Sequence, residues 1–338
     1  MIFNYKNGRF KLIQFTDIHY VTDTYNVKTG DGKIMPVNEA ALYTIEKMVK
    51  EENPDLIIFT GDLVFASGHG MIDNLKMFEN IGKLLDSIGV PWVFTNGNHD
   101  GNNVECLYSW ENLFDTFSNY KTYAGDKNDI FAGPNISQRG YGNGVVRLKD
   151  KNNVTQFAFI LIDNGWGYSE KQASWLENAV NMLKEENPNV KAIAFAHCPF
   201  DNYGDKNDGT RGKNQEEGMA NYSERIIEGS GNFSDIMFMF LNDGGVADII
   251  EKSEIITSAF VGHFHKNDCI AILEKNGRKL YQGFGKTGDY IAYNIGEGAK
   301  TGDPMERGCR IFLFEEGKST FTTYIKEVNG KEKGYVEI

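Results

Sequence analysis

Short apolar runs alternate with amphipathic stretches through the first two hundred residues. Runs rich in apolar and β-branched residues, bounded by polar turns, are typical of strands, and apolar residues at helical spacing indicate helices. We predict strands near 10–16, 56–60, 90–95, 144–149, 154–162 and 190–196. We predict helices near 39–51, 71–88, 104–118 and from Ser169 to about 185. Such alternation is typical of an α/β sheet covered by helices.

The pattern changes in the second half. Residues 201–218 are rich in Gly, Asn, Asp and Lys and are expected to form a long surface loop, which in a compact domain is often a functional lid. Further elements are expected as helices at 219–228 and 233–253, and as strands at 256–261, 267–274, 278–284, 289–294, 309–315 and 319–327. Because no long linker divides these elements, we expect one domain over 1–338, with two packed sheets and helices outside.

Five of the apolar runs end directly in side chains that bind metals, and five of the six histidines lie there. The candidate residues at these ends are Asp17, His19, Asp62, Asn98, His99, Asp100, His197, His263 and His265. The carboxyl ends of strands are where open α/β sheets bind ligands. The sequence therefore predicts one metal centre, and hydrolysis at a bound metal is the leading hypothesis.

Spacing and donor type refine this prediction. Asp17 and His19 are two residues apart, as are His263 and His265, so in extended segments each pair would face one side. Asp62 can bridge two cations through its two oxygens. The nitrogen and oxygen donors suit Mn, Fe, Zn or Co better than Ca or a structural zinc. Seven candidate ligands (all of those above except His99 and Asp100) suit two ions about 3.5–4 Å apart.

The net charge and the cysteine pattern limit the classes of partner and the cellular location that we expect. The formal charge of −12 argues against a nucleic-acid or anionic-membrane partner, since both favour a basic surface. No charged-then-apolar leader precedes Phe10. The scattered Cys106, Cys198, Cys269 and Cys309 are expected to be reduced thiols of a cytoplasmic protein. Cys198 is expected to point away from His197, as a buried thiol. The oligomeric state is left open.

The ordered motifs resemble a known family. Asp-x-His, Gly-Asp, Gly-Asn-His-Asp, a His before Pro and Gly-His-x-His, spanning 17–265, are similar to those of the calcineurin-like metallophosphoesterase superfamily. The resemblance implies a four-layer α/β/β/α sandwich with a dinuclear centre at the sheet tops. It also implies a first metal held by Asp17, His19 and His265, a second held by Asn98, His197 and His263, and Asp62 as the bridge.

The resemblance also implies a reaction. His99 corresponds to a histidine that faces the substrate and assists the leaving group, with Asp100 accepting a hydrogen bond from it and fixing its tautomer. Attack on phosphorus would come from a metal-bound hydroxide. A phosphomonoesterase is the first expectation. A phosphodiesterase for cyclic nucleotides or glycerophosphodiesters, and a non-catalytic interaction module, are the alternatives. The two divalent ions are expected to be Mn, Fe or Zn.

A finer resemblance and several weaker candidates remain. Segments 262–268, 283–288 and 307–310 resemble the branch containing Dcr2-type phosphatases and purple-acid-phosphatase-like proteins. The chain departs from true purple acid phosphatases at Phe65, where their tyrosine ligand stands, so a ferric–tyrosinate colour is not expected. Asn98 and His99 are candidates for contact with the substrate. His69 and Arg211 are weaker candidates for the same role, because a solvated position in a loop is the simpler interpretation of each. Asp163–Asn164 also end an apolar run, where a turn or an outer supporting role is expected.

Overall fold

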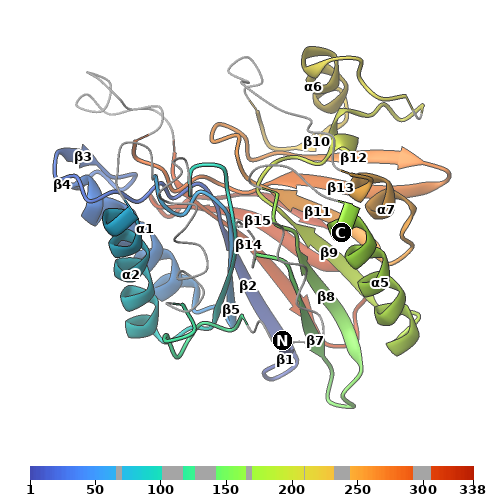
Figure 1. Ribbon diagram of the computed structural model, residues 1–338, viewed down its shortest axis with the longest axis horizontal. Helices are drawn as coiled ribbons and strands as arrows, with labels where there is room; N and C mark the ends of the chain where they lie inside the picture. Colours follow the sequence, from blue (N-terminus) through green and yellow to red (C-terminus); the bar gives the residue numbers. More distant parts are fainter. Residues whose placement is uncertain are drawn as a thin grey trace.

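Two large sheets lie face to face with helices on both outer faces in the computed structural model (Figure 1). The structure describes residues 1–65, 71–100, 117–125, 142–164, 170–208, 210–231, 244–291 and 306–338. The layer order is helix, sheet, sheet, helix, which confirms the four-layer α/β/β/α sandwich of mixed sheets that the sequence predicts.

The six-stranded sheet joins the two ends of the chain. Its order is β16 (Glu332–Glu337), β15 (Phe321–Glu327), β14 (Gly308–Glu315), β2 (Arg9–Phe15), β5 (Leu56–Thr60) and β6 (Trp92–Thr95). Strand β2 is central because Ile13 pairs in parallel with Ile57 on one side and antiparallel with Ile311 on the other. The last three strands of the chain therefore complete the sheet that its first long strand begins.

The eight-stranded sheet takes its strands mainly from the middle of the chain. Its order is β1 (Ile2–Asn4), β7 (Gly144–Lys149), β8 (Thr155–Leu161), β9 (Lys191–Phe195), β11 (Ile256–Val261), β13 (Arg278–Phe284), β12 (Ile270–Lys275) and β10 (Ile226–Glu228). Strands β8, β9, β11 and β13 run parallel. A separate hairpin pairs β3 (Asn26–Lys28) with β4 (Ile34–Pro36).

Helices cover the outer faces because their apolar stripes need burial. Helices α1 (Val37–Glu52) and α2 (Met71–Ile88) lie on the six-stranded sheet, and α5 (Glu170–Glu186) and α7 (Val246–Lys252) lie on the eight-stranded sheet (Figure 1). Among the described residues, no helix is both long and apolar enough to cross a lipid bilayer. The short η2 (Asp201–Gly204) and α6 (Gln215–Ser223) complete the helical elements that the structure describes in full.

Aromatic side chains fill the space between the sheets. The Phe312 ring meets Phe260 edge-on with centroids 4.8 Å apart and Phe195 at 5.5 Å. Strand β2 alternates, since Phe10 and Leu12 face this inner core while Ile13 and Phe15 face α1 and α2. This two-sided burial explains why apolar residues occur on both faces of β2.

Several expected boundaries were wrong. Residues 201–218 are not one surface loop, because they begin in η2, where Tyr203 is buried, and end in α6. Residues 226–228 form β10 instead of helix, since pairing with β12 overrides helical propensity. The expected strand at 289–294 is not formed at 289–291. Most of the expected helix at 104–118 lies outside the described residues.

We predict that Phe312→Ala lowers the free energy of unfolding by about 3–5 kcal/mol, because it opens a cavity between the two sheets. Urea unfolding followed by tryptophan fluorescence measures this change. Ile34→Ala is the control, since Ile34 is 74% exposed and its truncation should leave the unfolding midpoint nearly unchanged. Equal effects of the two substitutions would contradict the packing described here.

Candidate metal centre

The carboxyl ends of β2, β5, β9 and β11 meet where the two sheets touch. The Asp17 N–H donates to the Gly61 carbonyl at 3.1 Å, which joins the segments after β2 and β5. The Gln14 side chain donates to the Val261 carbonyl at 3.3 Å across the sheets. The Gly262 N–H donates to the His197 carbonyl at 2.8 Å, which adds the end of β9. These bonds bring four strand ends together and explain why residues so far apart in sequence share one site.

One group of candidate ligands is fully enclosed. Asp17, His19, Asp62 and His265 are all buried, and each offers a ligand atom within 4.8 Å of the others. His19 Nε2 lies 3.1 Å from Asp62 Oδ2, and His265 Nε2 lies 3.2 Å from Asp17 Oδ1. Two carboxylates and two imidazoles therefore face one small volume.

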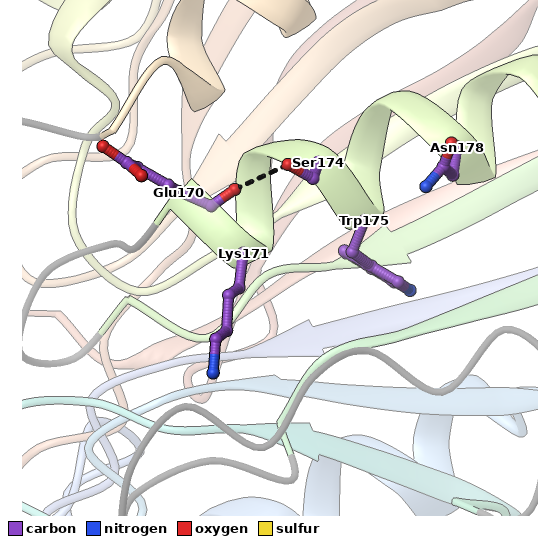
Figure 2. Close-up of a pocket in the computed structure, with 5 residues that line it drawn as sticks. All are labelled: Glu170, Lys171, Ser174, Trp175 and Asn178. Carbon is purple, nitrogen blue, oxygen red and sulfur yellow. Dashed lines mark hydrogen bonds between the residues drawn. The ribbon is translucent and has the colours of Figure 1, made fainter.

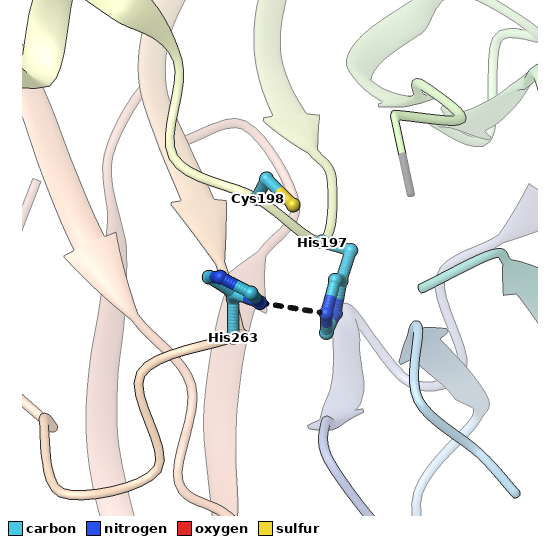
Figure 3. Close-up of side chains that lie close together, drawn as sticks. All are labelled: His197, Cys198 and His263. Carbon is cyan, nitrogen blue, oxygen red and sulfur yellow. Dashed lines mark hydrogen bonds between the residues drawn. The ribbon is translucent and has the colours of Figure 1, made fainter. Parts of the chain in front are cut away.

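A second group adjoins the first through His197. Its Nε2 lies 3.0 Å from Asn98 Oδ1. The same atom lies 3.3 Å from His263 Nδ1 (Figure 3). The same nitrogen lies 3.2 Å from Asp62 Oδ2. Asp62 Oδ2 thus contacts one imidazole of each group. All seven residues that the sequence nominates as ligands are brought together.

Cys198 also lies in this second group, contrary to expectation. Its sulfur is within 4.8 Å of ring nitrogens of His197 and His263 (Figure 3). The expectation that it points away was wrong because β9 ends at Phe195, so strand alternation no longer holds at Cys198. Cys198 is buried and unpaired, and burial raises the pKa of its thiol well above the usual value.

Four of the seven candidate ligands have an uncommon backbone conformation. The φ angles of Asp17, His19, Asp62 and His263 are 51°, 50°, 51° and 72°. Such left-handed conformations are rare for residues other than glycine and cost on the order of 1–3 kcal/mol each. The expected extended geometry of the two paired motifs is therefore wrong, because tight turns begin where the strands end. Strained backbone of this kind clusters at functional sites.

Glycines permit the close approach of these turns. A Cβ atom on Gly262 would overlap the Thr16 hydroxyl, and one on Gly97 would overlap the backbone N–H and carboxylate of Asp62. The His263 N–H donates to Asp17 Oδ2 at 3.0 Å across this tight packing. Glycine is thus required beside the ligands for steric reasons.

Asp100 holds the turns that carry Asp62 and Asn98. It is fully buried, and its carboxylate accepts from the N–H groups of Asp62 at 2.8 Å, Val64 at 3.0 Å and Gly97 at 2.8 Å. These bonds fix the loop around Asp62. The expected bond from the His99 ring to Asp100 stays a prediction.

His99 lies at the edge of the cluster beside Phe65. The backbone N–H of His99 donates to Asp62 Oδ1 at 2.7 Å. Its ring centroid is 4.9 Å from that of Phe65 and 5.1 Å from that of His19. Phe65 also stacks on His19 at 5.4 Å, so a hydrocarbon ring packs where a phenol would be needed for tyrosinate ligation. Burial lowers the pKa of His99 to about 4, and its ring is therefore neutral at pH 7.

The charges inside the cluster balance one another. Burial would raise the pKa of Asp17, but His265 outweighs this effect and lowers it. Burial alone would lower the pKa values of His197 and His265. The Asp62 carboxylate instead raises the pKa of His197 to about 9, and the Asp17 carboxylate raises the pKa of His265 to about 10. Two buried carboxylates therefore require positive charge next to them, which protons supply in the metal-free protein.

This arrangement fits divalent cations. Among the residues that the structure describes, His19 Nδ1 is buried without a hydrogen-bond partner. The other ring nitrogen, Nε2, lies 3.1 Å from Asp62 Oδ2, beside carboxylates that need positive charge, and a cation between such groups would supply it. The imidazole, carboxylate and amide donors match the preferences of Zn, Mn and Fe.

Two further residues support the cluster from outside, one through the backbone of His197 and the other through the His265 ring. Asn164 Oδ1 accepts from the N–H groups of His197 and Cys198, both at 2.9 Å, which confirms an outer role for Asn164. Asp289 Oδ2 lies 3.0 Å from His265 Nδ1 and was missed in the sequence. The only signal was an acidic residue shortly after the end of β13.

Two candidates for substrate contact remain, His69 and Arg211. His69 lies outside the described residues. The Arg211 guanidinium is ion-paired with Asp201, with Asp205 at 3.3 Å and with Asp248 at 2.6 Å. These pairs anchor η2 and α7 to the segment before α6. The expected substrate contact of Arg211 stays a prediction.

A surface hollow lies on α5. It encloses about 550 Å³ and is lined by Glu170, Lys171, Ser174, Trp175 and Asn178 (Figure 2). Ser174 Oγ donates to the Glu170 carbonyl at 3.0 Å within the helix. None of the candidate metal ligands lines this hollow.

Comparison with known proteins agrees with the site. Residues 10–267 match the model of the calcineurin-like phosphoesterase family. The chain is 24% identical over 339 residues to probable inactive purple acid phosphatase 29 of Arabidopsis thaliana, covering 92% of this chain and 78% of that protein. It is 25% identical over 295 residues to probable inactive purple acid phosphatase 28 of the same plant, covering 79% and 68%.

A solved structure shares the fold. The dimetal phosphatase from Danio rerio superposes with a TM-score of 0.57 at 10% sequence identity, covering 97% of this chain and 98% of that one. The family model spans the strand ends that carry all seven candidate ligands. The chain therefore belongs to the calcineurin-like phosphoesterase family.

Proposed function

We propose that this chain is a dinuclear metal-dependent phosphomonoesterase. The observation that carries the proposal is the convergence of buried carboxylates and imidazoles from both sheets, with Asp62 Oδ2 in contact with His19 and His197. Buried ionisable groups with mutually shifted pKa values are typical of functional sites.

The contacts support an assignment of ligands. Asp17, His19 and His265 would hold one ion, and Asn98, His197 and His263 would hold the other, with Asp62 between them. When bound, two such ions lower the pKa of water and neutralise charge on phosphoryl oxygens. The donor set suits Mn, Fe or Zn.

His99 is the proposed catalytic side chain. Its neutral ring retains one N–H donor, which can hydrogen-bond to a phosphoryl or leaving-group oxygen. Phe65 and His19 pack against the ring, and the bond from the backbone N–H of His99 to Asp62 holds the His99 backbone in place. Asn98, one residue earlier, is the second proposed substrate contact. Asp100 supports both residues by holding the turn at Gly97.

The proposed substrate is a phosphate monoester, since the relatives and the structural neighbour are named as phosphatases. The same residues would support cleavage of cyclic nucleotides or glycerophosphodiesters, which is the second candidate. The relatives' names also include the word inactive, which favours a non-catalytic module as the third. In this chain every ligand position is filled, which supports turnover. Its buried unpaired cysteines favour a cytoplasmic location.

We predict that His99→Ala lowers kcat on an aryl phosphomonoester by about 10²- to 10³-fold, because a positioned hydrogen-bond donor to the phosphoryl or leaving-group oxygen is lost. Steady-state kinetics measure the rate, and elemental analysis measures the metal content. The metal content should stay near that of the wild type, since His99 is not a proposed ligand. Unchanged kcat with full metal content would remove His99 from the mechanism.

We predict faster hydrolysis of an aryl phosphomonoester than of the matching diester. The two substrates should share one leaving group, so that the comparison isolates the charge and shape of the phosphate. The ratio of kcat/KM values at equal metal loading is the measurement. A higher value for the diester would replace the monoesterase proposal with a phosphodiesterase, and no turnover of either would favour the non-catalytic module.

We predict that dialysis against a chelator abolishes activity and lowers the thermal unfolding midpoint. A cation at 100 times its dissociation constant stabilises a folded protein by about 2.7 kcal/mol, so its removal should be visible in a melting curve. Activity and midpoint should return together on adding Mn²⁺, Fe²⁺ or Zn²⁺. Full activity in protein shown by elemental analysis to be free of metal would contradict the proposal.

A further inference from the structure

The segment that follows β13 forms hydrogen bonds with the turn that carries Asp17. Thr287 Oγ1 donates to the Asp17 carbonyl at 3.1 Å and accepts from the Asp289 N–H at 3.1 Å. The Gly288 N–H donates to the Thr16 carbonyl at 3.2 Å. This segment lies beyond residues 10–267, which match the family model. It therefore reaches the metal centre from a part of the chain that the match does not include.

Asp289 is held in one orientation. Its side chain is fully buried, and Oδ1 accepts from the Ile291 N–H at 2.6 Å. Oδ2 lies 3.0 Å from His265 Nδ1. The opposite ring nitrogen of His265, Nε2, lies 3.2 Å from Asp17 Oδ1. The imidazole is thus clamped between a candidate metal ligand and a carboxylate behind it.

The Asp289 carboxylate favours one position of the proton on the His265 ring. A carboxylate facing Nδ1 retains the proton on that nitrogen, which leaves the lone pair of Nε2 for a cation. His197 differs, since its Nδ1 faces the neutral Thr60 carbonyl at 2.9 Å. Only one of these two imidazoles therefore has a negative charge behind it.

We propose that Asp289 is a positioning residue that fixes the tautomer of His265 and retains the cation held by Asp17, His19 and His265. The inference rests on the proposed metal centre. It adds a residue that touches neither substrate nor metal and acts only through the His265 ring.

The test measures Mn²⁺ binding to wild type, Asp289→Asn and Asp289→Ala by calorimetric titration and elemental analysis. One of the two ions should bind about 10- to 100-fold more weakly in the Asp289 variants, because the ligand imidazole loses its partner. Asp205→Asn is the matched control, since Asp205 is equally buried but pairs with Arg211 and Lys275. Its affinity for both ions should equal that of the wild type.

The outcomes separate the two proposals. Two ions bound equally tightly by wild type and Asp289 variants would overturn the role of Asp289 and leave the proposed function standing. A wild type that binds no Mn²⁺ would overturn both. An equal loss of Mn²⁺ affinity in Asp205→Asn and in the Asp289 variants would show a general effect of removing a buried charge. It would also overturn the role of Asp289.

A second measurement needs no variant. In the zinc-loaded wild type with ¹⁵N-labelled histidine, His265 should carry its proton on Nδ1, with the proton resonance shifted downfield by the carboxylate. A proton on Nε2 would overturn the inference. This result holds even where an Asp289 variant fails to fold.

Discussion

Two carboxylates, Asp17 and Asp62, are buried close together, and this constraint governs the surrounding structure. Like charges in a buried site repel each other and lack solvation, so positive charge must accompany them. The imidazoles of His197 and His265 provide it by taking up protons in the metal-free protein. Divalent cations would provide the same compensation with more charge per group, which explains how one architecture serves both folding and metal binding.

Holding these charges in place draws on the backbone as much as on side chains. Four ligand residues take left-handed conformations, and glycines beside them allow turns to approach within contact distance. Asp100 and Asn164 satisfy the N–H groups that these turns leave open, which compensates part of the strain. These bonds hold the turns around the candidate ligands.

The sequence nominated the candidate ligands but missed part of the structure that supports them. Each candidate ligand closely follows an apolar strand, so local pattern and motif order sufficed to nominate it, and the layered fold followed from the resemblance to the family. Asp289 could not be found in this way, because its role depends on a contact with His265 that no spacing rule encodes. The turns at Asp17 and His263 were missed since their φ angles depend on packing between the sheets. Strand β10 forms only because β12 offers it an edge.

The pairing of Ile13 with Ile311 has a consequence for synthesis of the protein. Strand β2 (Arg9–Phe15) leaves the ribosome long before its neighbour β14 (Gly308–Glu315), because roughly 300 residues separate them along the chain. At ordinary elongation rates the nascent chain would wait roughly 15–60 s with one flank of an apolar strand unprotected. Exposed strand edges of this kind invite association with other chains. Productive folding of this molecule is thus expected to depend on molecular chaperones that shield its amino-terminal third until the carboxyl-terminal strands emerge.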